Sequence, residues 1–394
     1  MTRPRRSAVA MLAGLAALVT LVSACSIPAR PAWWPKPGHT TAHEAARGGR
    51  AGASPSPSPS PVPVVAAPWH SGMRQLGIQV YWTANPNDES DAVVAAKARR
   101  LINYAISLNA NSIAISFPFY TDGITSDRVY AESGVTPTPA HIAIFLAEAA
   151  QSHLRVTLRP ILNEDVLVAQ NALAWRGSIE PADPAAWFQS YRRLLMPYAR
   201  VAQAGHAATF VIGTELESLE ASPDWQHLIS SVRAVYTGQL AYDENFDEFA
   251  AGPATLPLET YDIDAYPRFD LSDSASVAEL TSAWDTWLGT HSLSVRQQLT
   301  LSEVGIDAVP GAYSDPGAWI GTSNSPVDTR VQANWFRAVC DAISNEQVGG
   351  GVYWWDISFD ADPASPAPFL SDRLTFVGRP AAHVIRECFA RLAS

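Results

Sequence analysis

The stretch ATFVIGTE, residues 208–215, decides the fold, because it is an apolar run that ends in a charge at Glu215. A second run, LTLSE at residues 299–303, ends in the same way at Glu303. Short apolar runs of this kind predict buried strands of a parallel sheet, where a charged side chain is costly to bury. The C-terminal ends of barrel strands are the places where a (β/α)₈ fold carries such groups. We therefore expect both glutamates at the mouth of a barrel.

Similar apolar runs recur along the chain and alternate with helical patterns. They predict strands at 76–82, 111–117, 154–161, 208–215, 239–243, 260–266, 298–303 and 350–355. Helices are predicted at 90–108, 139–152, 184–204, 223–236, 275–290, 327–346 and 379–392. The segment between the fifth and sixth predicted strands is long enough for only one turn of helix. This alternation predicts an α/β fold of the (β/α)₈ TIM-barrel type. A doubly wound open sheet is the competing fold, but no Gly-rich phosphate loop supports it.

Residues 1–25 have the pattern of a secretion signal. Arginines precede an apolar segment from Ala8 to Val22, which is short for a membrane span. The sequence Val22-Ser23-Ala24-Cys25 then resembles a bacterial lipobox, which implies cleavage before Cys25 and lipid attachment to its sulfur. An ordinary signal with an incidental cysteine is the alternative. We expect an extracytoplasmic protein that is anchored to the bacterial cell membrane by lipid alone.

Residues 26–66 are predicted to be a disordered linker, because serine or valine alternates with proline from Ser54 to Pro63. Residues 67–394 then form one domain, and 47% of the whole chain is hydrophobic, enough for a large core. Seven of the 27 basic residues and one of the 38 acidic residues precede residue 67, which leaves this domain a net charge of −17. That charge argues against nucleic acid or an anionic membrane surface as a partner.

Two further cysteines, Cys340 and Cys388, fall on predicted late helices. Outside the cytoplasm they could form a disulfide, and two buried free thiols are the alternative. The histidines are scattered without metal-ligand spacing, so we expect neither a metal nor a cofactor. No Gly-x-Ser-x-Gly elbow is present, which argues against an esterase.

Four short motifs resemble those of clan A glycoside hydrolases. They are FVIGTELE at 210–217, LSEVG at 301–305, GVYWW at 351–355 and FVGRPA at 376–381. Within that clan the chain most resembles glycoside hydrolase family 113, whose founding activity is β-mannanase. The resemblance covers roughly residues 72–392. Each motif is short, and it is their order and spacing that carry the match.

The resemblance implies that Glu215, at the end of the fourth strand, is the acid/base and that Glu303, at the end of the seventh, is the nucleophile. The implied mechanism is retaining, with a covalent glycosyl-enzyme intermediate and carboxyl groups about 5–5.5 Å apart. Glu215 must then hold a raised pKa, and Glu303 must stay ionised. Glu217 and Glu220 are expected to be ordinary solvated carboxylates near the strand end.

The resemblance also implies residues that contact the sugar. Tyr266 should hydrogen-bond the nucleophile, unless it is only an aromatic at the rim of the core. Of Trp354 and Trp355, only one should face the barrel mouth, since successive strand residues point to opposite sides; the family pattern favours Trp354 as a stacking surface. Thr214 departs from the clan, in which an asparagine often precedes the acid/base, and this leaves the identity of the bound sugar in doubt.

Other polar and aromatic residues near strand ends are candidates to line the cleft. For Arg159 the alternative is a buried ion pair that orients a catalytic carboxylate. The candidates are Trp82, Arg159, Asn163, Glu164, Tyr242, Asp243 and Asn245.

The sequence therefore predicts a retaining glycoside hydrolase, acting as a monomer on a β-linked glycan such as β-mannan or a related hexose polymer. A non-catalytic glycan-binding lipoprotein on the same scaffold is the alternative, although a binding module has no need of both glutamates. An intracellular barrel enzyme is disfavoured by the signal and the lipobox.

Overall fold

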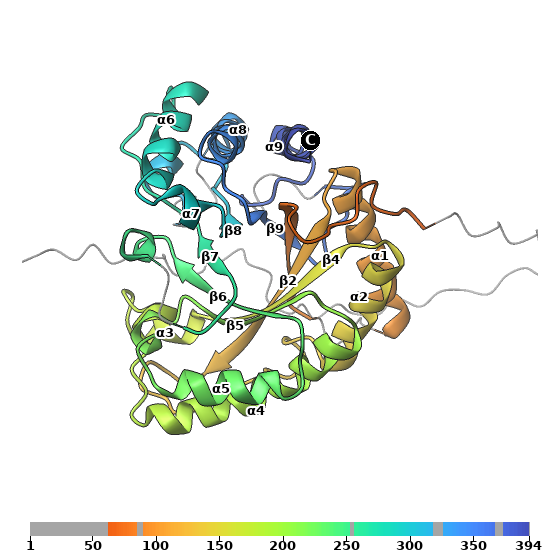
Figure 1. The fold of residues 1–394 in the computed structure, drawn as a ribbon, viewed down its shortest axis with the longest axis vertical. Coiled ribbons are helices and arrows are strands. Elements are labelled where there is room, and N and C mark those ends of the chain that lie inside the picture. The colour runs from red at the N-terminus through yellow and green to blue at the C-terminus, as the bar shows by residue number, and fades with distance from the viewer. Residues whose placement is uncertain (1–61, 85–89, 253–255, 318–325, 367–372, 394) are drawn as a thin grey trace, which may run out of the picture.

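The chain folds into a closed barrel of parallel strands with helices packed around it (Figure 1). The computed structural model describes residues 62–84, 90–252, 256–317, 326–366 and 373–393. The predicted signal and nearly all of the predicted linker lie outside these residues. The strands are β1 (Gln75–Tyr81), β2 (Ser112–Thr121), β3 (Val129–Tyr130), β4 (Arg155–Leu162), β5 (Thr209–Thr214), β6 (Gln239–Asn245), β7 (Tyr261–Asp264), β8 (Leu299–Val304) and β9 (Gly351–Ser358).

Eight of these strands form the barrel, and their positions confirm the eight predicted from the sequence. The order is β1-β9-β8-β7-β6-β5-β4-β2, and β1 pairs with β2 to close the ring. All the pairings within the ring are parallel, so every strand ends at the same mouth. The short β3 pairs antiparallel with the end of β2 and was not predicted.

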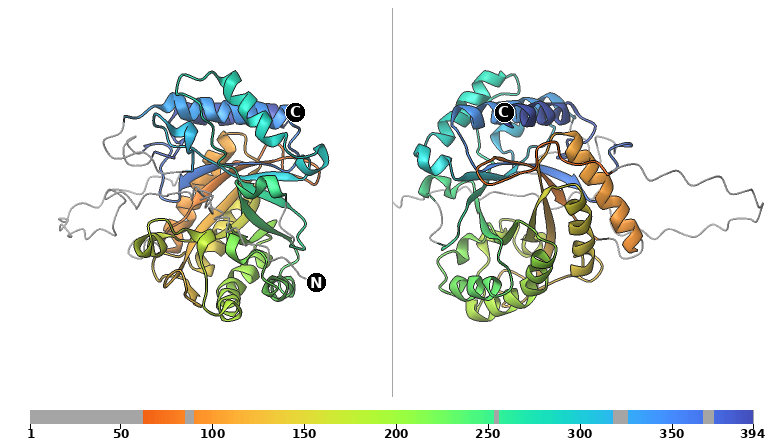
Figure 2. Two further views of the ribbon diagram at one scale, coloured as in Figure 1. Left: turned by 90° about the vertical axis from the view of Figure 1, so that its left-hand side faces the viewer. Right: turned by 45° about the vertical axis from the view of Figure 1, so that its right-hand side comes forward.

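Helices follow most strands and cover the outside of the barrel (Figures 1 and 2). The helices are α1 (Asp91–Ser107), α2 (Pro139–Gln151), α3 (Asp165–Gln170), α4 (Pro184–Ala204), α5 (Asp224–Arg233), α6 (Val277–Leu288), α7 (Leu293–Arg296), α8 (Thr329–Asn345) and α9 (Pro380–Leu392). The 3₁₀ helices are η1 (Arg176–Ser178), η2 (Glu217–Leu219), η3 (Glu248–Ala251) and η4 (Ala312–Ser314). Among the described residues between β6, the fifth strand of the barrel, and β7, the single helical element is the short η3, as the sequence indicated. In the described part of the chain, no helix has the length and apolar character needed to cross a membrane.

Two helices, α2 and α4, begin with a capping residue followed by proline. The Thr138 side chain accepts the His141 N–H at the start of α2, and Asp183 accepts the Ala186 N–H at 3.0 Å at the start of α4. In both helices proline is the first residue, where its missing N–H has no cost. These caps fix where each helix begins, and so fix the lengths of the loops between helix and strand.

The floor of the barrel is polar and is organised by one arginine. The Arg155 guanidinium donates to Thr157, to Thr209 and to Tyr353 Oη, at distances between 2.6 and 3.2 Å. The Trp69 ring lies 4.8 Å from its central carbon and covers it from below. Both terminal nitrogens of the buried cation therefore donate hydrogen bonds, and the chain that leads into β1 packs against it.

A disulfide joins Cys340 on α8 to Cys388 on α9, with Cα atoms 5.8 Å apart. Of the two alternatives left open by the sequence, the structure therefore holds the pair rather than the free thiols. The two helices lie beside each other at the top of Figure 1, and both cysteines are buried between them. The last helix is thus tied to its neighbour on the outside of the barrel.

Replacing Cys340 and Cys388 together by alanine is expected to lower the free energy of unfolding by about 2–4 kcal/mol, because the cross-link restricts the unfolded chain. Chemical denaturation without reductant measures the change. Adding reductant should lower the stability of the wild type and leave that of the double variant unchanged. Equal stability of wild type and variant under non-reducing conditions would show that the bond contributes nothing.

Candidate active site

Glu215 stands at the barrel mouth immediately after β5. The pairing of β5 with β6 shifts its register between Val211 and Thr214, and Glu215 itself has a left-handed backbone with φ of +51°. Its N–H donates to the Asp243 carbonyl oxygen at 2.8 Å, which holds this uncommon conformation in place. The Glu215 side chain is buried, and it leaves the strand at a point fixed by the backbone.

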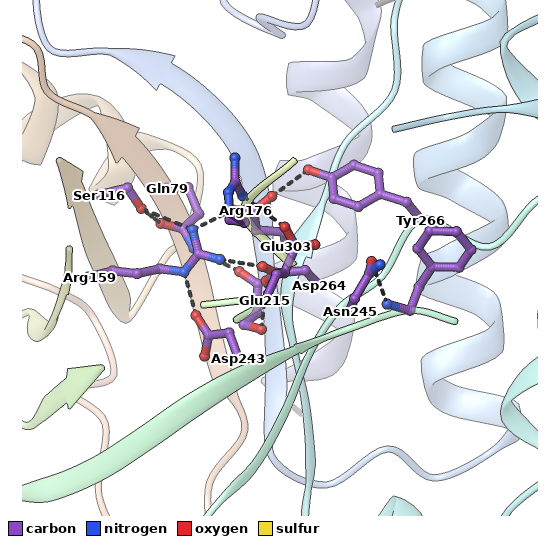
Figure 3. A network of polar contacts seen from close by, with 12 residues as sticks. Gln79, Ser116, Arg159, Arg176, Glu215, Asp243, Asn245, Asp264, Tyr266 and Glu303 are labelled. Atoms are coloured by element: carbon purple, nitrogen blue, oxygen red, sulfur yellow. Dashed lines mark hydrogen bonds and ion pairs between the residues drawn. The ribbon is translucent and has the colours of Figure 1, made fainter. Parts of the chain in front are cut away.

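Glu303 lies within β8 and is also buried. The Tyr266 hydroxyl donates to Glu303 Oε2 at 2.6 Å, and Arg159 donates through Nη1 to Glu303 Oε1. Each carboxylate oxygen therefore accepts a hydrogen bond from a different strand end. This contact agrees with the role that the family resemblance implied for Tyr266, and Figure 3 shows its ring pointing toward Glu303.

Arg159, on β4, is the centre of the site (Figure 3). Its guanidinium donates from Nε to Asp243, from Nη2 to Asp264 and from Nη1 to Glu303, and it is fully buried. A guanidinium presents several donors in one rigid plane, so it can bind three carboxylates at once. The alternative proposed for Arg159, an ion pair that orients a carboxylate, matches this arrangement.

A second set of hydrogen bonds, between residues on the barrel strands, supports the Asp264 carboxylate of this cluster. Ser302 Oγ donates to Asp264 Oδ1 at 3.0 Å, and Gln79 Nε2 donates to the Ser302 carbonyl oxygen at 2.8 Å. The Ser116 hydroxyl donates to Gln79 Oε1, also at 2.8 Å. Residues from β1, β2, β7 and β8 thus fix the carboxylate that faces Arg159. All of these residues are buried, and their hydrogen bonds support the position of the guanidinium.

A second arginine, Arg176 on η1, contacts the other glutamate. Its Nη1 donates to Glu215 Oε2 at 2.8 Å, and its Nε lies 3.1 Å from Glu164 Oε1. The sequence named Glu164 among the cleft candidates but gave no reason to single out Arg176. Arg176 lies in a long irregular segment between β4 and α4, where no periodicity marks a residue as facing the site.

Burial and neighbouring charges give the acidic groups different protonation properties. Burial, opposed by Arg176 and reinforced by the charges of Glu303 and Glu164, raises the pKa of Glu215 to about 7. Burial also raises the pKa of Asp264 well above its usual value, although Arg159 opposes the shift. A carboxyl group with a pKa near 7 can donate a proton at neutral pH.

Trp355, rather than Trp354, faces the barrel mouth. The Trp355 ring is partly exposed, 5.7 Å from the Tyr81 ring and 6.0 Å from the central carbon of the Arg159 guanidinium. Trp354 is fully buried and packs at 4.5 Å from Phe336 on α8. The preference for Trp354 that came from the family pattern is therefore wrong, because that side chain points outward into the layer between strands and helices.

Trp82 and Tyr242 also lie in the core, which corrects their predicted contact with sugar. Trp82 is fully buried and stacks on Phe359 with ring centroids 3.8 Å apart. Tyr242 packs against Trp225 on α5 and donates its hydroxyl to Glu220 at 2.8 Å. Both rings are occupied by protein on the outer side of the barrel, so neither offers a face to a ligand.

Two asparagines among the candidates use their side chains on the local backbone. Asn163 Oδ1 accepts the Asp165 N–H at 2.9 Å at the start of α3, and Asn245 Oδ1 accepts the Phe246 N–H at the same distance. Asn163 is partly exposed and Asn245 is buried. The structure therefore places them beside the mouth as residues that shape its loops.

Thr214 is buried beside Glu215, and its hydroxyl has no hydrogen-bond partner among the described residues. Thr214 pairs in register with Asp243, which faces Arg159 inside the barrel. The shift in register after Val211 thus brings the threonine to the inner side. A buried hydroxyl without a partner is uncommon and is free to bond a ligand group.

Three acidic residues gather at the rim just beyond β5 and β6. Carboxylate oxygens of Glu217, Asp247 and Glu248 lie within 4.8 Å of one another. Burial, followed by the charges of Asp247 and Glu248, raises the pKa of Glu217 to about 7. Exposed acidic groups commonly gather without an ion, so the cluster does not by itself identify a metal site.

Comparison with known proteins gives a family match and several similar structures. The family model described as Glycoside Hydrolase Family 113 matches residues 85–369. A solved GH113 β-1,4-mannanase in a complex is 18% identical, with a TM-score of 0.66, and the match covers 81% of this chain and 99% of that one. The GH113 β-mannanase from Alicyclobacillus acidocaldarius, in complex with ManMIm, is 19% identical, with a TM-score of 0.65 and coverage of 82% and 98%. No curated protein matches the chain.

Replacing Arg159 by methionine is expected to lower the free energy of unfolding by about 3–5 kcal/mol near neutral pH, because three buried carboxylates lose their shared cation. The loss should shrink as the pH falls, since protonation removes the negative charges that the variant leaves buried without their cation. Urea denaturation at several pH values measures the effect.

Arg128 provides the matched control, since it forms an exposed pair with Asp122 at 3.3 Å. Replacing Arg128 by methionine should change stability by no more than about 1 kcal/mol. If the Arg159 variant were as stable as this control, the three-carboxylate cluster would not be the main electrostatic support of the barrel mouth.

Proposed function

We propose that this chain, which belongs to Glycoside Hydrolase Family 113 and is therefore a glycoside hydrolase, cleaves a β-linked glycan with retention of configuration. Glu303 is the nucleophile and Glu215 the acid/base. The observation that carries the proposal is the contrast between two buried carboxylates at one barrel mouth: two donors hold Glu303, while burial raises the pKa of Glu215 to about 7.

The surroundings of Glu303 suit a nucleophile. Arg159 and Tyr266 each donate a hydrogen bond to one of its oxygens, and such donors stabilise the charged carboxylate. They also fix the direction in which each oxygen points. An attack on the anomeric carbon forms a bond from Glu303 to the sugar and releases the leaving oxygen, which needs a proton.

Glu215 supplies that proton and later takes one from water. With a pKa of about 7 it holds a proton in a large fraction of molecules at neutral pH. When Glu303 becomes esterified, its negative charge disappears, and the contribution of that charge to the raised pKa of Glu215 disappears with it. Glu215 is then ionised in a larger fraction of molecules, so it is available as the base that the second step of a retaining mechanism requires.

The proposed substrate is β-mannan or a related hexose polymer. Support comes from the similar structures, which are β-mannanases, and from the partly exposed Trp355 ring, whose face suits stacking on a pyranose. Thr214 replaces the asparagine that many clan relatives carry, so contacts to the sugar hydroxyls beside the acid/base differ from the clan pattern.

We also propose that the enzyme acts outside the cytoplasm as a lipid-anchored monomer. The support is the lipobox sequence that ends at Cys25, which lies outside the described residues, and the Cys340–Cys388 disulfide, since such bonds persist in oxidising compartments. The proline-rich linker would hold the barrel away from the membrane, where it can reach a polymer.

Replacing either Glu215 or Glu303 by alanine is expected to lower kcat on an unactivated glycan by at least about 10³-fold. Azide should separate the two roles. Without the nucleophile, azide occupies the vacated space and gives a glycosyl azide of inverted configuration. Without the acid/base, an activated leaving group still departs, and azide gives the retained product.

Product configuration is read by NMR, with Glu217→Ala as the matched control, which should keep most of its activity. Rescue with the opposite stereochemistry would reverse the role assignment. Full activity in either variant would remove that glutamate from the mechanism, and no activity of the wild type on any glycan of a β-linked panel would contradict the proposed substrate class.

Replacing Cys25 by alanine is expected to release the protein from the membrane fraction or to block its processing. The reason is that lipid attachment needs the cysteine thiol. Fractionation of cells and mass spectrometry of the mature N-terminus measure the outcome. A variant that is processed and fractionates like the wild type would show that Cys25 is incidental.

A further inference from the structure

Arg176 lies between two carboxylates, those of Glu164 and Glu215, and contacts both. Its guanidinium donates to Glu215 Oε2 at 2.8 Å on one side and lies 3.1 Å from Glu164 Oε1 on the other. The Arg176 backbone N–H donates to the same Glu164 oxygen at 3.0 Å. All three side chains are largely buried, with 10–16% of each exposed, so water screens these charges only weakly.

The segment that carries Arg176 is fixed in place. Ser178 Oγ donates to the Trp175 carbonyl oxygen at 2.9 Å and accepts the Trp175 N–H at 3.0 Å, which closes η1 on itself. Ser218, on η2 just after Glu215, donates to the Ile179 carbonyl oxygen at 2.5 Å. The arginine and the acid/base therefore stand on two loops that are bonded together, and their contact is built into the fold.

The contact creates a conflict that Glu164 offsets. A guanidinium in direct contact with Glu215 favours its charged form, whereas an acid must keep its proton until the substrate binds. Glu164 shares the arginine and adds a negative charge nearby, which favours the protonated form of Glu215. Nothing in the retaining mechanism assigns a role to either Arg176 or Glu164.

We propose that Glu164 and Arg176 are positioning residues that set the protonation of Glu215 through this carboxylate–guanidinium–carboxylate row. The inference rests on the proposed role of Glu215 as acid/base. Other charged or titratable groups of the mouth also act on Glu215, and the effect of the row adds to theirs. These groups are Arg159 on β4, Asp264 on β7, Tyr266 after β7 and Glu303 on β8.

The row predicts opposite effects of its two members. Glu164→Gln removes a negative charge, so Glu215 becomes the one carboxylate of the row that pairs with Arg176. The pKa of Glu215 should therefore fall by roughly 1 unit. Arg176→Met removes the cation, so the pKa should rise by roughly 1 unit or more. Arg176→Lys keeps the charge and should give a smaller rise. A merely structural role would not shift the pKa in opposite directions.

The test measures the pKa of Glu215 directly. In the full chain labelled with ¹³C at the glutamate carboxyl carbons, the Glu215 signal is assigned by its loss in Glu215→Gln and is then titrated by NMR. The basic limb of kcat/KM on a substrate with a poor leaving group should move with the same sign, while a substrate with an activated leaving group should show no such limb.

Arg99 and Glu148 offer matched controls, because they pair at 3.4 Å on α1 and α2, away from the mouth. Arg99→Met and Glu148→Gln should leave the titration of Glu215 unchanged. Shifts of one sign in both site variants, or none in either, would overturn the inference. If the pKa of Glu215 shifted in opposite directions in the two variants but the wild type turned over no glycan, the role of Glu164 and Arg176 would be supported and the proposed function refuted. Failure of the inference and failure of the proposed function can therefore be told apart.

Discussion

The barrel mouth depends on one buried cation. Arg159 binds Asp243, Asp264 and Glu303, which come from the neighbouring strands β6, β7 and β8 and lie 84 to 144 residues from it in the sequence. Burying a single charge is costly, and three carboxylates near one another would repel; the cluster is stabilised because each nitrogen of the guanidinium donates to one of them. The same interaction that permits charged residues inside the barrel also holds Glu303, the carboxylate that we assign to nucleophilic attack.

Much of this arrangement could be predicted from the sequence, because buried parallel strands are continuous apolar runs. A glutamate at the end of such a run is a strong signal, and both Glu215 and Glu303 lie where that signal placed them. The barrel followed from counting the runs. The starts of α2 and α4 carry a similarly local signal, a capping residue followed by proline.

Other features depend on contacts that a linear pattern does not contain. The pairing of β9 with each neighbouring strand shifts its register next to Trp354 and Trp355. Side chains there do not follow the simple inward and outward alternation of a strand, so the sequence could not show which of the two rings faces the mouth. Trp82 and Tyr242 end their strands like site residues, but their rings pack outward. Arg176 reaches Glu215 from an irregular loop, where only the three-dimensional path of the chain reveals its role.

The left-handed backbone of Glu215 has a consequence for how the protein can change. A non-glycine residue in this conformation is destabilised by about 1–3 kcal/mol, and burying its carboxylate adds to that cost. Replacing Glu215 by asparagine or glycine would reduce both the backbone strain and the cost of the buried carboxylate, but it would remove the catalytic group that we propose. Selection for a hardier protein would therefore act against catalysis at this position, and a thermostable descendant of this chain that kept Glu215 must have gained its stability elsewhere.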